Sequence, residues 1–386
     1  MFQEVGKEER YMQLRKLDSS EHSGTRKLWE MVFPEDSKEF LDYYYFIKTR
    51  DNQIYVIEED GAVRSMLQLN PYVLQIGSTQ RLCNYVIAVA TEEAYRKRGY
   101  MGRLLRASMA DMYEQKQPFT FLMPAAESIY RPYDFRFVYA QNQEESCGQP
   151  GTMTVSISDA GLSDASAMAA FFNTHYAAGY QVYAVRDDQY YQTMIFEQQS
   201  ENGGVKLLKK GIDIVGMFAY AREEESIEIR EPLYLPQFES EFRTAVYQMR
   251  EGQSAPAKIY AGAESGQTRK VPLIMLRILH LETLLSAMRV KEGKEINCSF
   301  AVLDSIITKN SRVWRLKNSD EDQKILVSET EDSEGVLTIG ALTALLFGYQ
   351  TVEETGREEG VILSPRLKQE LGKLQPLHPL YLNEIV

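Results

Sequence analysis

Apolar and polar residues alternate along several segments of the chain, and in others the apolar residues recur every three or four positions. Residues 83–89 alternate and predict a strand. After a basic loop, apolar residues return at the spacing of a helix that lies on a sheet, namely at Met101, Leu104, Leu105, Met109, Met112 and Tyr113. Residues 119–123 form a short apolar run and predict a second, buried strand. The stretch therefore predicts a strand–loop–helix–strand unit of an α/β domain.

The residues before this unit extend the same domain. Residues 11–16 predict a first strand, and Asp18 followed by Glu21 is the pattern of a helix N-terminus. Two apolar segments within residues 54–69 are separated by an Asp-Gly turn, which predicts a β-hairpin. With the strand–loop–helix–strand unit, these elements predict one α/β domain over residues 1–150.

Residues 151–272 repeat part of this order. A helix over 165–175, three strands within 205–230 and a helix over 239–249 are predicted. Residues 231–237, between the last strand and that helix, contain no glycine and no arginine. Because a pyrophosphate needs backbone amides and positive charge, we do not expect this second copy to bind one. It is expected instead to shape a substrate cleft or an oligomer contact.

Residues 273–386 predict a third, α+β unit. A helix over 281–288 is followed by three strands, and 337–349 is a strand that runs into a strongly apolar helix. The last residues of the chain are rich in large apolar side chains, at Leu377, Leu380, Tyr381, Leu382, Ile385 and Val386. Disordered termini rarely have this composition, so we expect the tail to be buried.

The basic loop before the first long helix predicts an anion site. Arg96, Lys97 and Arg98 supply positive charge, and Gly99 and Gly102 remove side chains that would keep a ligand from the backbone. The free amides of a helix's first turn and the helix dipole favour negative charge there. The nucleotide P-loop string and the dinucleotide fingerprint are both absent.

Composition narrows the classes of function. A net charge of −12 argues against a general nucleic-acid binder and suits a cationic substrate. No apolar run approaches the ~18 residues of a membrane-spanning helix, and the N-terminus lacks a signal-peptide pattern. Three separated cysteines and four scattered histidines give no disulfide framework and no metal-ligand spacing. We expect a cytoplasmic protein with no metal, no nucleic-acid partner and no membrane contact.

Two segments resemble the motifs of the GNAT N-acetyltransferases. Arg96-x-x-Gly99-x-Met101 is similar to the R-x-x-G-x-G/A loop that holds the pyrophosphate of acetyl-CoA in that family, with Met101 at a place where a small residue is usual. Residues 129–135 are similar to the later F-Y-x-x-x-G-F segment, with Asp134 where glycine is usual. In that segment the tyrosine, here Tyr130, faces the acetyl-CoA sulfur and protonates the departing thiolate.

The layout of the whole chain resembles the Eis (enhanced intracellular survival) family. That resemblance implies an active GNAT domain over 1–150, a degenerate GNAT-like domain over 151–272 and a sterol-carrier-protein-like domain over 273–386. It implies acetyl transfer from acetyl-CoA to amines of aminoglycosides, polyamines or lysine side chains, and assembly as a homo-hexamer. The cofactor contacts implied in the first domain are Ile87, Ala88, Val89, Arg96, Lys97, Arg98, Gly99, Met101 and Gly102.

The resemblance also implies two catalytic groups, Tyr130 as general acid and the α-carboxylate of Val386 as general base. An amine must be neutral to attack a thioester, so a base must take its proton. A free α-carboxyl titrates near ~3.5 and is a poor base, but burial raises its pKa. Backbone amides near Val89 are suited to polarise the thioester carbonyl. Tyr133 and Tyr139 are alternative acids.

Other interpretations remain open at this point. Glu35, Asp36 and Asp42 are either an amine pocket or a solvated acidic loop. Cys83 suits a buried structural thiol better than a nucleophile. The alternative to an enzyme is a non-catalytic protein that senses CoA or holds an apolar ligand in the sterol-carrier-like module. The sequence does not name the amine.

Overall fold

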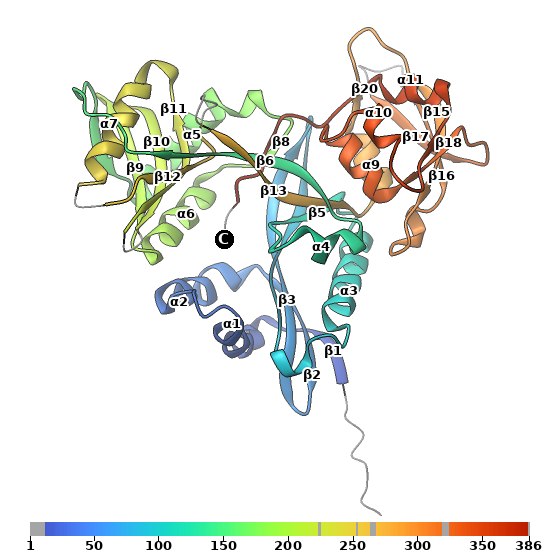
Figure 1. The fold of residues 1–386 in the computed structure, drawn as a ribbon, viewed down its shortest axis with the longest axis horizontal. Helices are drawn as coiled ribbons and strands as arrows, with labels where there is room; N and C mark the ends of the chain where they lie inside the picture. Colours follow the sequence, from blue (N-terminus) through green and yellow to red (C-terminus); the bar gives the residue numbers. More distant parts are fainter. Residues whose placement is uncertain (1–11, 223–224, 252–253, 263–267, 319–323, 385–386) are drawn as a thin grey trace, which may run out of the picture. The chain divides into compact units, whose positions relative to one another are not determined.

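The computed structural model describes residues 12–222, 225–251, 254–262, 268–318 and 324–384. Its contacts divide the chain into two compact units, and Figure 1 shows the elements of each. The first unit comprises residues up to 71 together with 84–115. The second comprises 72–83 together with the residues from 116 on. The long strands β3 (Ala62–Ile76) and β4 (Thr79–Thr91) each continue from one unit into the other.

The first unit contains the predicted N-terminal α/β elements. Its strand order is β1 (Met12–Lys16), β2 (Gln53–Glu59), β3 and β4, and β2 pairs antiparallel with both β1 and β3. The predicted hairpin is therefore confirmed. Its helices are η1 (Ser19–Thr25), α1 (Arg26–Val32), α2 (Lys38–Phe46), η2 (Lys48–Arg50), η3 (Glu93–Tyr95) and α3 (Tyr100–Glu114). The predicted helix start is also confirmed, because the Asp18 amide donates to the Glu21 carboxylate at 3.0 Å.

Helix α3 is held by the apolar residues that predicted it. Leu104, Leu105, Met109 and Met112 are fully buried, and each such side chain contributes roughly 1.5–3 kcal/mol to folding. At the far end of α3, the Tyr55 hydroxyl on β2 donates to Asp111 at 2.7 Å. The packing fixes the axis of α3, and with it the direction in which its N-terminus points.

The second unit is built on one long mixed sheet. In spatial order its strands are β5 (Phe119–Leu122), β13 (Arg269–Ile278), β6 (Arg136–Ser146), β12 (Ala257–Tyr260), β11 (Ile227–Tyr234), β10 (Asp213–Arg222), β9 (Gly204–Lys210) and β7 (Ser156–Asp159). Only β11 and β12 among these neighbours pair in parallel, as far as the described residues show. The helical turns after β5 are α4 (Glu127–Tyr130) and η4 (Arg131–Tyr133).

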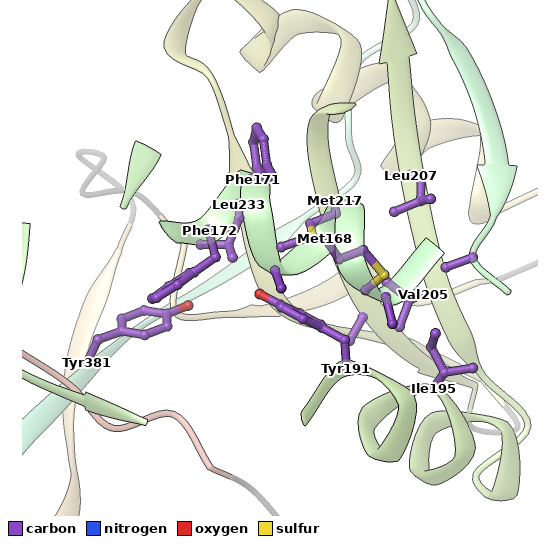
Figure 2. Packing of buried hydrophobic residues seen from close by; sticks show 14 residues of the cluster. Met168, Phe171, Phe172, Tyr191, Ile195, Val205, Leu207, Met217, Leu233 and Tyr381 are labelled. Carbon is purple, nitrogen blue, oxygen red and sulfur yellow. The ribbon is translucent and has the colours of Figure 1, made fainter. Parts of the chain in front are cut away.

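Helices cover both faces of the β9–β10–β11 part of this sheet (Figure 1). Side chains on one face, such as Leu207 and Met217, pack against α5 (Ala165–His175) and α6 (Asp188–Ser200). Figure 2 shows this cluster. Leu208 and Phe218, which follow Leu207 and Met217 in the chain, point to the other face and pack against α7 (Glu239–Met249). The alternation follows from the period of two along a strand. Short 3-10 turns lie at η5 (Leu162–Asp164), η6 (Ala177–Gly179) and η7 (Pro236–Phe238).

The C-terminal part of this unit contains a separate five-stranded sheet. Its order is β17 (Ile325–Thr330), β16 (Val313–Asn318), β15 (Asn297–Leu303), β18 (Gly335–Thr338) and β19 (Ile362–Leu363). The strand running into an apolar helix is confirmed, because α9 (Ile339–Leu346) follows β18 and all its residues are buried. The other elements are α8 (Leu281–Ala287), η8 (Thr308–Asn310), α10 (Val352–Thr355), α11 (Pro365–Leu371) and the pair β14 (Arg289–Val290) and β20 (Leu374–Gln375).

The tail returns from this C-terminal region to the long sheet. β21 (Leu380–Tyr381) pairs in parallel with β8 (Val182–Ala184), which pairs antiparallel with the end of β3. Residues 380–384 are all buried. The expected burial of the tail is thus confirmed through Glu384. Val386, expected to supply the base, lies outside the described residues.

Candidate active site

The predicted anion loop lies between the end of β4 and the start of α3, within the first unit. Gly99 caps α3 with φ +80°, a left-handed conformation that side chains with a Cβ disfavour. The first hydrogen bond of the helix runs from the Arg103 amide to the Gly99 carbonyl at 3.1 Å. The amides of Tyr100, Met101 and Gly102 therefore have no carbonyl partner within the helix. No acidic residue lies in this first turn, so the positive end of the helix dipole is not neutralised.

The three basic side chains of the loop have different roles. Arg98 packs over the Tyr95 ring at 4.5 Å and lies 3.5 Å from Glu59, so part of its charge is neutralised within the protein. The Arg96 guanidinium donates to the Thr91 carbonyl at 3.2 Å and is otherwise exposed, and Lys97 is exposed with φ +63°. Arg96 and Lys97 are thus exposed to solvent, whereas Arg98 stabilises the loop through its contacts with Tyr95 and Glu59.

The residues behind the loop were not found from the sequence. Glu59, at the end of β2, is buried and accepts a hydrogen bond from the Tyr100 hydroxyl, which raises the pKa of Tyr100. The Arg64 guanidinium also lies over the Tyr95 ring, 4.6 Å from the ring centroid, and it pairs with Glu92 at 2.7 Å. These contacts join β2 and β3 to the loop. Nothing in the local sequence marks them, because the partners are 28 to 41 positions apart.

Strand β4 carries an irregular residue at its predicted cofactor-contact positions. Ala88 has φ +51°, which is uncommon for a residue other than glycine and absent from regular strands. Its neighbours Ile87 and Val89 are half-buried. After this residue, Ser65 on β3 donates to the Ala90 carbonyl at 2.9 Å. A left-handed residue turns the local backbone out of the ladder, as in a β-bulge, and frees a peptide group for another partner.

Tyr130 ends helix α4, in the second unit. It is 8 % exposed, and its ring lies edge-on to Phe135 with centroids 5.8 Å apart. Burial alone raises the pKa of Tyr130 to about 12. Asp134 occupies the glycine place of the motif with φ +65°, so the turn keeps the left-handed geometry that glycine would supply. Aspartate is among the residues that tolerate this conformation.

Local contacts bear on several other hypotheses from the sequence. Asp36 accepts from the Trp29 indole at 2.6 Å, and Asp42 pairs with Arg26 at 2.6 Å, so both have structural partners. Cys83 is fully buried, which raises the pKa of its thiol and suits the structural interpretation. Burial also raises the pKa of Tyr139. Within the part of the chain that the structure describes, no group of His, Cys, Asp and Glu is placed to hold a metal ion. No helix there is long and apolar enough to cross a membrane.

A buried charged cluster missed by the sequence lies beside the tail. Arg186 is fully buried and contacts Glu231 directly, and it lies 3.8 Å from Glu384. The rings of Phe172, Tyr190 and Tyr381 surround its guanidinium with centroids at 4.4, 4.7 and 5.1 Å. Figure 2 shows Tyr381 beside Phe172 at the edge of the apolar core. We call Arg186, Glu231 and Glu384 the Arg186 cluster.

Comparisons with known families agree with these features. Residues 13–138 match the acetyltransferase (GNAT) domain, and residues 281–377 match the sterol carrier protein domain. The chain therefore contains a GNAT-type acetyltransferase domain and a C-terminal sterol carrier protein domain. A comparison with curated proteins gives no match.

Solved structures share the fold over nearly the whole chain. A probable N-acyltransferase from Enterococcus faecalis V583 has a TM-score of 0.80 at 18% identity, over 95% of this chain and 98% of that one. A GCN5-related N-acetyltransferase from Anabaena variabilis has 0.77 at 17%, over 94% and 97%. Eis1 from Mycobacterium abscessus has 0.68 at 14%, over 95% and 98%. The chain thus has the Eis-like fold that its motifs predicted.

Proposed function

We propose that this protein is an acetyl-CoA-dependent N-acetyltransferase that acts on a primary amine of an aminoglycoside-, polyamine- or lysine-like cation. The start of α3 is the observation that carries the proposal. A pyrophosphate requires backbone amides that the helix leaves without a carbonyl partner, a left-handed glycine such as Gly99 and exposed basic side chains, and the start of α3 has these groups. We assign the CoA pyrophosphate to Arg96, Lys97, Arg98, Gly99, Met101 and Gly102, and the acetyl carbonyl to backbone amides at Ile87, Ala88 and Val89.

Two groups would move protons while the amine attacks the thioester directly. Tyr130 suits the general acid, because a phenol with a pKa near 12 stays protonated at neutral pH and can donate to the leaving thiolate. The resemblance to the Eis family assigns the general base to the Val386 carboxylate, which follows the buried residues 380–384 in the sequence. No covalent intermediate on the protein is needed.

The charge of the Arg186 cluster supports a cationic acceptor. Two carboxylates face one guanidinium there, so the cluster carries one more negative than positive charge. Four tyrosines adjoin it, at positions 72, 190, 191 and 381, and of these Tyr191 and Tyr381 are buried. Carboxylates and aromatic faces together favour ammonium groups over neutral or anionic substrates.

The remaining expectations stand as parts of the same proposal. We divide the chain into an acetyl-CoA-binding domain over 1–150, a second GNAT-like domain over 151–272 that does not bind cofactor, and a sterol-carrier-like domain over 273–386. By resemblance to the Eis family, we propose a homo-hexamer. From the composition and charge of the sequence, we propose a cytoplasmic location, with no metal, nucleic acid or membrane as partner.

Thiol release from acetyl-CoA, measured against a panel of aminoglycosides and polyamines, tests the proposal. The intact protein should turn over at least one of these amines. Tyr130→Phe should lower kcat by roughly 100-fold or more, since general acid catalysis contributes about that much. Tyr133→Phe is the matched control, because it removes a phenol three positions away. If kcat fell in Tyr133→Phe and not in Tyr130→Phe, the general acid would be Tyr133 and not Tyr130.

A chain extended by two residues past Val386 tests the base. The extension moves the terminal carboxylate and should lower kcat while acetyl-CoA still binds. Unchanged turnover would exclude the terminal carboxylate from the reaction.

The alternative is a non-catalytic protein that senses CoA or holds an apolar ligand. A cavity of about 420 Å³ in the second unit is lined by Gly77, Ser78, Gln181, Ala287, Arg289, Val290, Glu292, Gln375 and Leu377. Its charged and amide side chains suit a polar rather than an apolar ligand. Thermal unfolding separates the two functions, because a bound ligand stabilises the folded state. Stabilisation by fatty acids, with binding of acetyl-CoA but no turnover of any amine, would support the alternative.

A further inference from the structure

The turn that follows Tyr130 determines where its phenol lies. The Asp134 amide donates to the Arg131 carbonyl at 3.0 Å, and the Phe135 amide donates to the Tyr130 carbonyl at 3.4 Å. The Phe135 ring also lies edge-on to the Tyr130 ring. Burial is the only influence that raises the pKa of Tyr130, so no charge or hydrogen bond within the described residues fixes its hydroxyl. A displacement of this turn would therefore displace the phenol.

Two arginines from different strands hold the turn. Arg277 on β13 donates through Nε to the Tyr133 carbonyl at 3.1 Å. Arg136 on β6 donates through Nη1 to the Phe135 carbonyl at 3.0 Å. These two carbonyls flank the left-handed Asp134. Burial raises the pKa of Asp134, and the positive charges of Arg277 and Arg136 act against that rise, so both guanidiniums lie near its carboxyl. Charged donors make stronger hydrogen bonds than neutral ones, and here they fix the turn on both sides.

Arg277 is oriented by a buried carboxylate. The side chains of Arg277 and Asp304 are both inaccessible to solvent, and the guanidinium donates to Asp304 Oδ1 at 2.6 Å. The same oxygen accepts from the amides of Ile306 and Ile307 at 3.0 and 2.8 Å. The other oxygen, Oδ2, accepts from the Asn310 side chain at 3.0 Å. A buried guanidinium is costly unless a carboxylate pairs with it, so Asp304 fixes where Arg277 lies.

Arg136 packs against a helix that leaves room for it. Its guanidinium lies over Gly340, in the first turn of α9, where a Cβ would come within 2.7 Å of the guanidinium carbon. Any larger residue at this position would push the guanidinium away from the Phe135 carbonyl. Glu358 lies 3.9 Å from the Arg136 guanidinium and offsets part of its charge.

The groups that fix the two arginines belong to the same domain. Asp304, Gly340 and Glu358 all lie within residues 281–377, which match the sterol carrier protein domain, whereas both arginines and the turn lie outside that match. One contact of this kind would be ordinary packing. Two contacts, made through side chains of separate strands and ending on the carbonyls beside one residue, indicate that the domain sets the conformation of the turn.

We propose that the sterol carrier protein domain is a positioning element for Tyr130, which it fixes through Arg277 and Arg136. Both arginines act through the turn and are therefore positioning residues. The catalytic part of this inference rests on the proposed function, whereas the effect of the domain on the turn does not.

Amide hydrogen exchange tests the effect on the turn without any acetyl transfer. In Gly340→Ala, the added methyl displaces the Arg136 guanidinium and removes a hydrogen bond from a charged donor. Exchange of the Asp134 and Phe135 amides should then be about tenfold faster than in the intact protein, as measured by mass spectrometry. Gly372→Ala is the matched control, because its methyl would lie in ordinary contact, at 3.4 Å, within the same domain. Equal exchange in the two variants would overturn the effect of the domain on the turn.

Kinetics test the positioning role. Gly340→Ala and Arg136→Gln should each lower kcat roughly 10- to 100-fold and leave KM for acetyl-CoA near its original value. Arg136→Lys should restore part of kcat. Because both changes act through one hydrogen bond, the double variant should be no slower than Arg136→Gln alone. Unchanged kcat in Gly340→Ala, or losses that add in the double variant, would overturn the positioning role.

Asp304→Asn tests the contact through Arg277. It should also speed exchange of the turn and lower kcat, because it removes the negative charge that fixes the guanidinium. If this variant does not fold, Gly340→Ala still decides the outcome, since its methyl displaces the flexible end of a side chain.

The two measurements separate this inference from the proposed function. If the intact protein acetylates no amine, the proposed function and the positioning role both fail, while exchange still decides whether the domain holds the turn. If exchange is faster in Gly340→Ala but turnover is normal, the positioning role fails and the proposed function survives.

Discussion

The β4–α3 and β11–α7 segments are the same structural unit made from different residues. Each is a strand with one left-handed residue that is not glycine, Ala88 or Glu231, followed by a short turn and an amphipathic helix. In the first, that residue lies at the proposed contact with the acetyl carbonyl. In the second, its side chain contacts Arg186. Both segments therefore contain a distorted strand, but the distorted residue has a different role in each.

The N-termini of α3 and α7 differ more than the strands that precede them. α3 begins after a left-handed glycine and has no acidic residue in its first turn, whereas α7 begins after Phe238 and has Glu239 and Glu241 there. Glu241 accepts hydrogen bonds from Ser240, at 2.6 Å, and from Thr154. The second helix therefore satisfies its positive end with its own carboxylates. The residues of the turn, and not the fold, therefore decide whether a helix start suits an anion.

Reversing the charge of the basic loop before α3 should have the largest effect. Arg96→Glu combined with Lys97→Glu should weaken acetyl-CoA binding by about 100-fold, because each lost charged contact costs about 1.5 kcal/mol and 1.4 kcal/mol is tenfold. Isothermal titration of acetyl-CoA measures the change. Lys309→Glu with Arg312→Glu, two exposed residues of the C-terminal region, changes the net charge equally and should change affinity little. Equal losses in both variants would indicate only a long-range charge effect.

Adding a Cβ at the cap of α3 should have the next largest effect. Gly99→Ala places a side chain at φ +80°, where no atom lies within 4 Å, so the cost is conformational and should be about 1–2 kcal/mol of folding free energy. Gly24→Ala is the control, because its surroundings are equally open and its φ is ordinary. Urea unfolding of both variants measures the difference. A cost no larger than that of the control would mean that the cap does not need glycine.

The sequence predicted the elements and the loop because both depend on residues close together in the chain. Periodicity located α3, and the basic residues with Gly99 indicated its anion site. The sequence did not predict that Ala88 has a left-handed conformation, because nothing in the residues around an alanine in a strand indicates one. Nor did it predict Arg186, Glu231 and Glu384 as a cluster, because they are far apart in sequence and charged residues are normally expected at the surface. Only tertiary structure brings them together.

Removing the acid at the start of α7 should cost less than these changes. Hydrogen bonds, chiefly from Ser240, lower the pKa of Glu241 below its ordinary value of 4.5. A lowered folded-state pKa gives stability that is present above pH ~4.5 and lost as the pH falls through the folded value. Glu241→Gln should therefore cost about 1 kcal/mol at pH 7 and little at pH 2–3, as measured by urea unfolding across pH. Glu239→Gln, which is more exposed, is the control, and parallel profiles for both would refute the role of Glu241.

Transferring that acid to the first helix should have the smallest effect and is the most direct link between the two segments. Met101→Glu places a carboxylate in the first turn of α3, as Glu241 does in α7, and should stabilise the empty helix by about 0.3–1 kcal/mol through the dipole. The same charge opposes the pyrophosphate, so the affinity for acetyl-CoA should fall by about two- to fivefold. Met101→Gln separates charge from size and should bind nearly as the original protein does. Thermal unfolding and isothermal titration on the three proteins would show stability and affinity moving in opposite directions. If both rose together in Met101→Glu, the start of α3 would not be the place where the pyrophosphate binds.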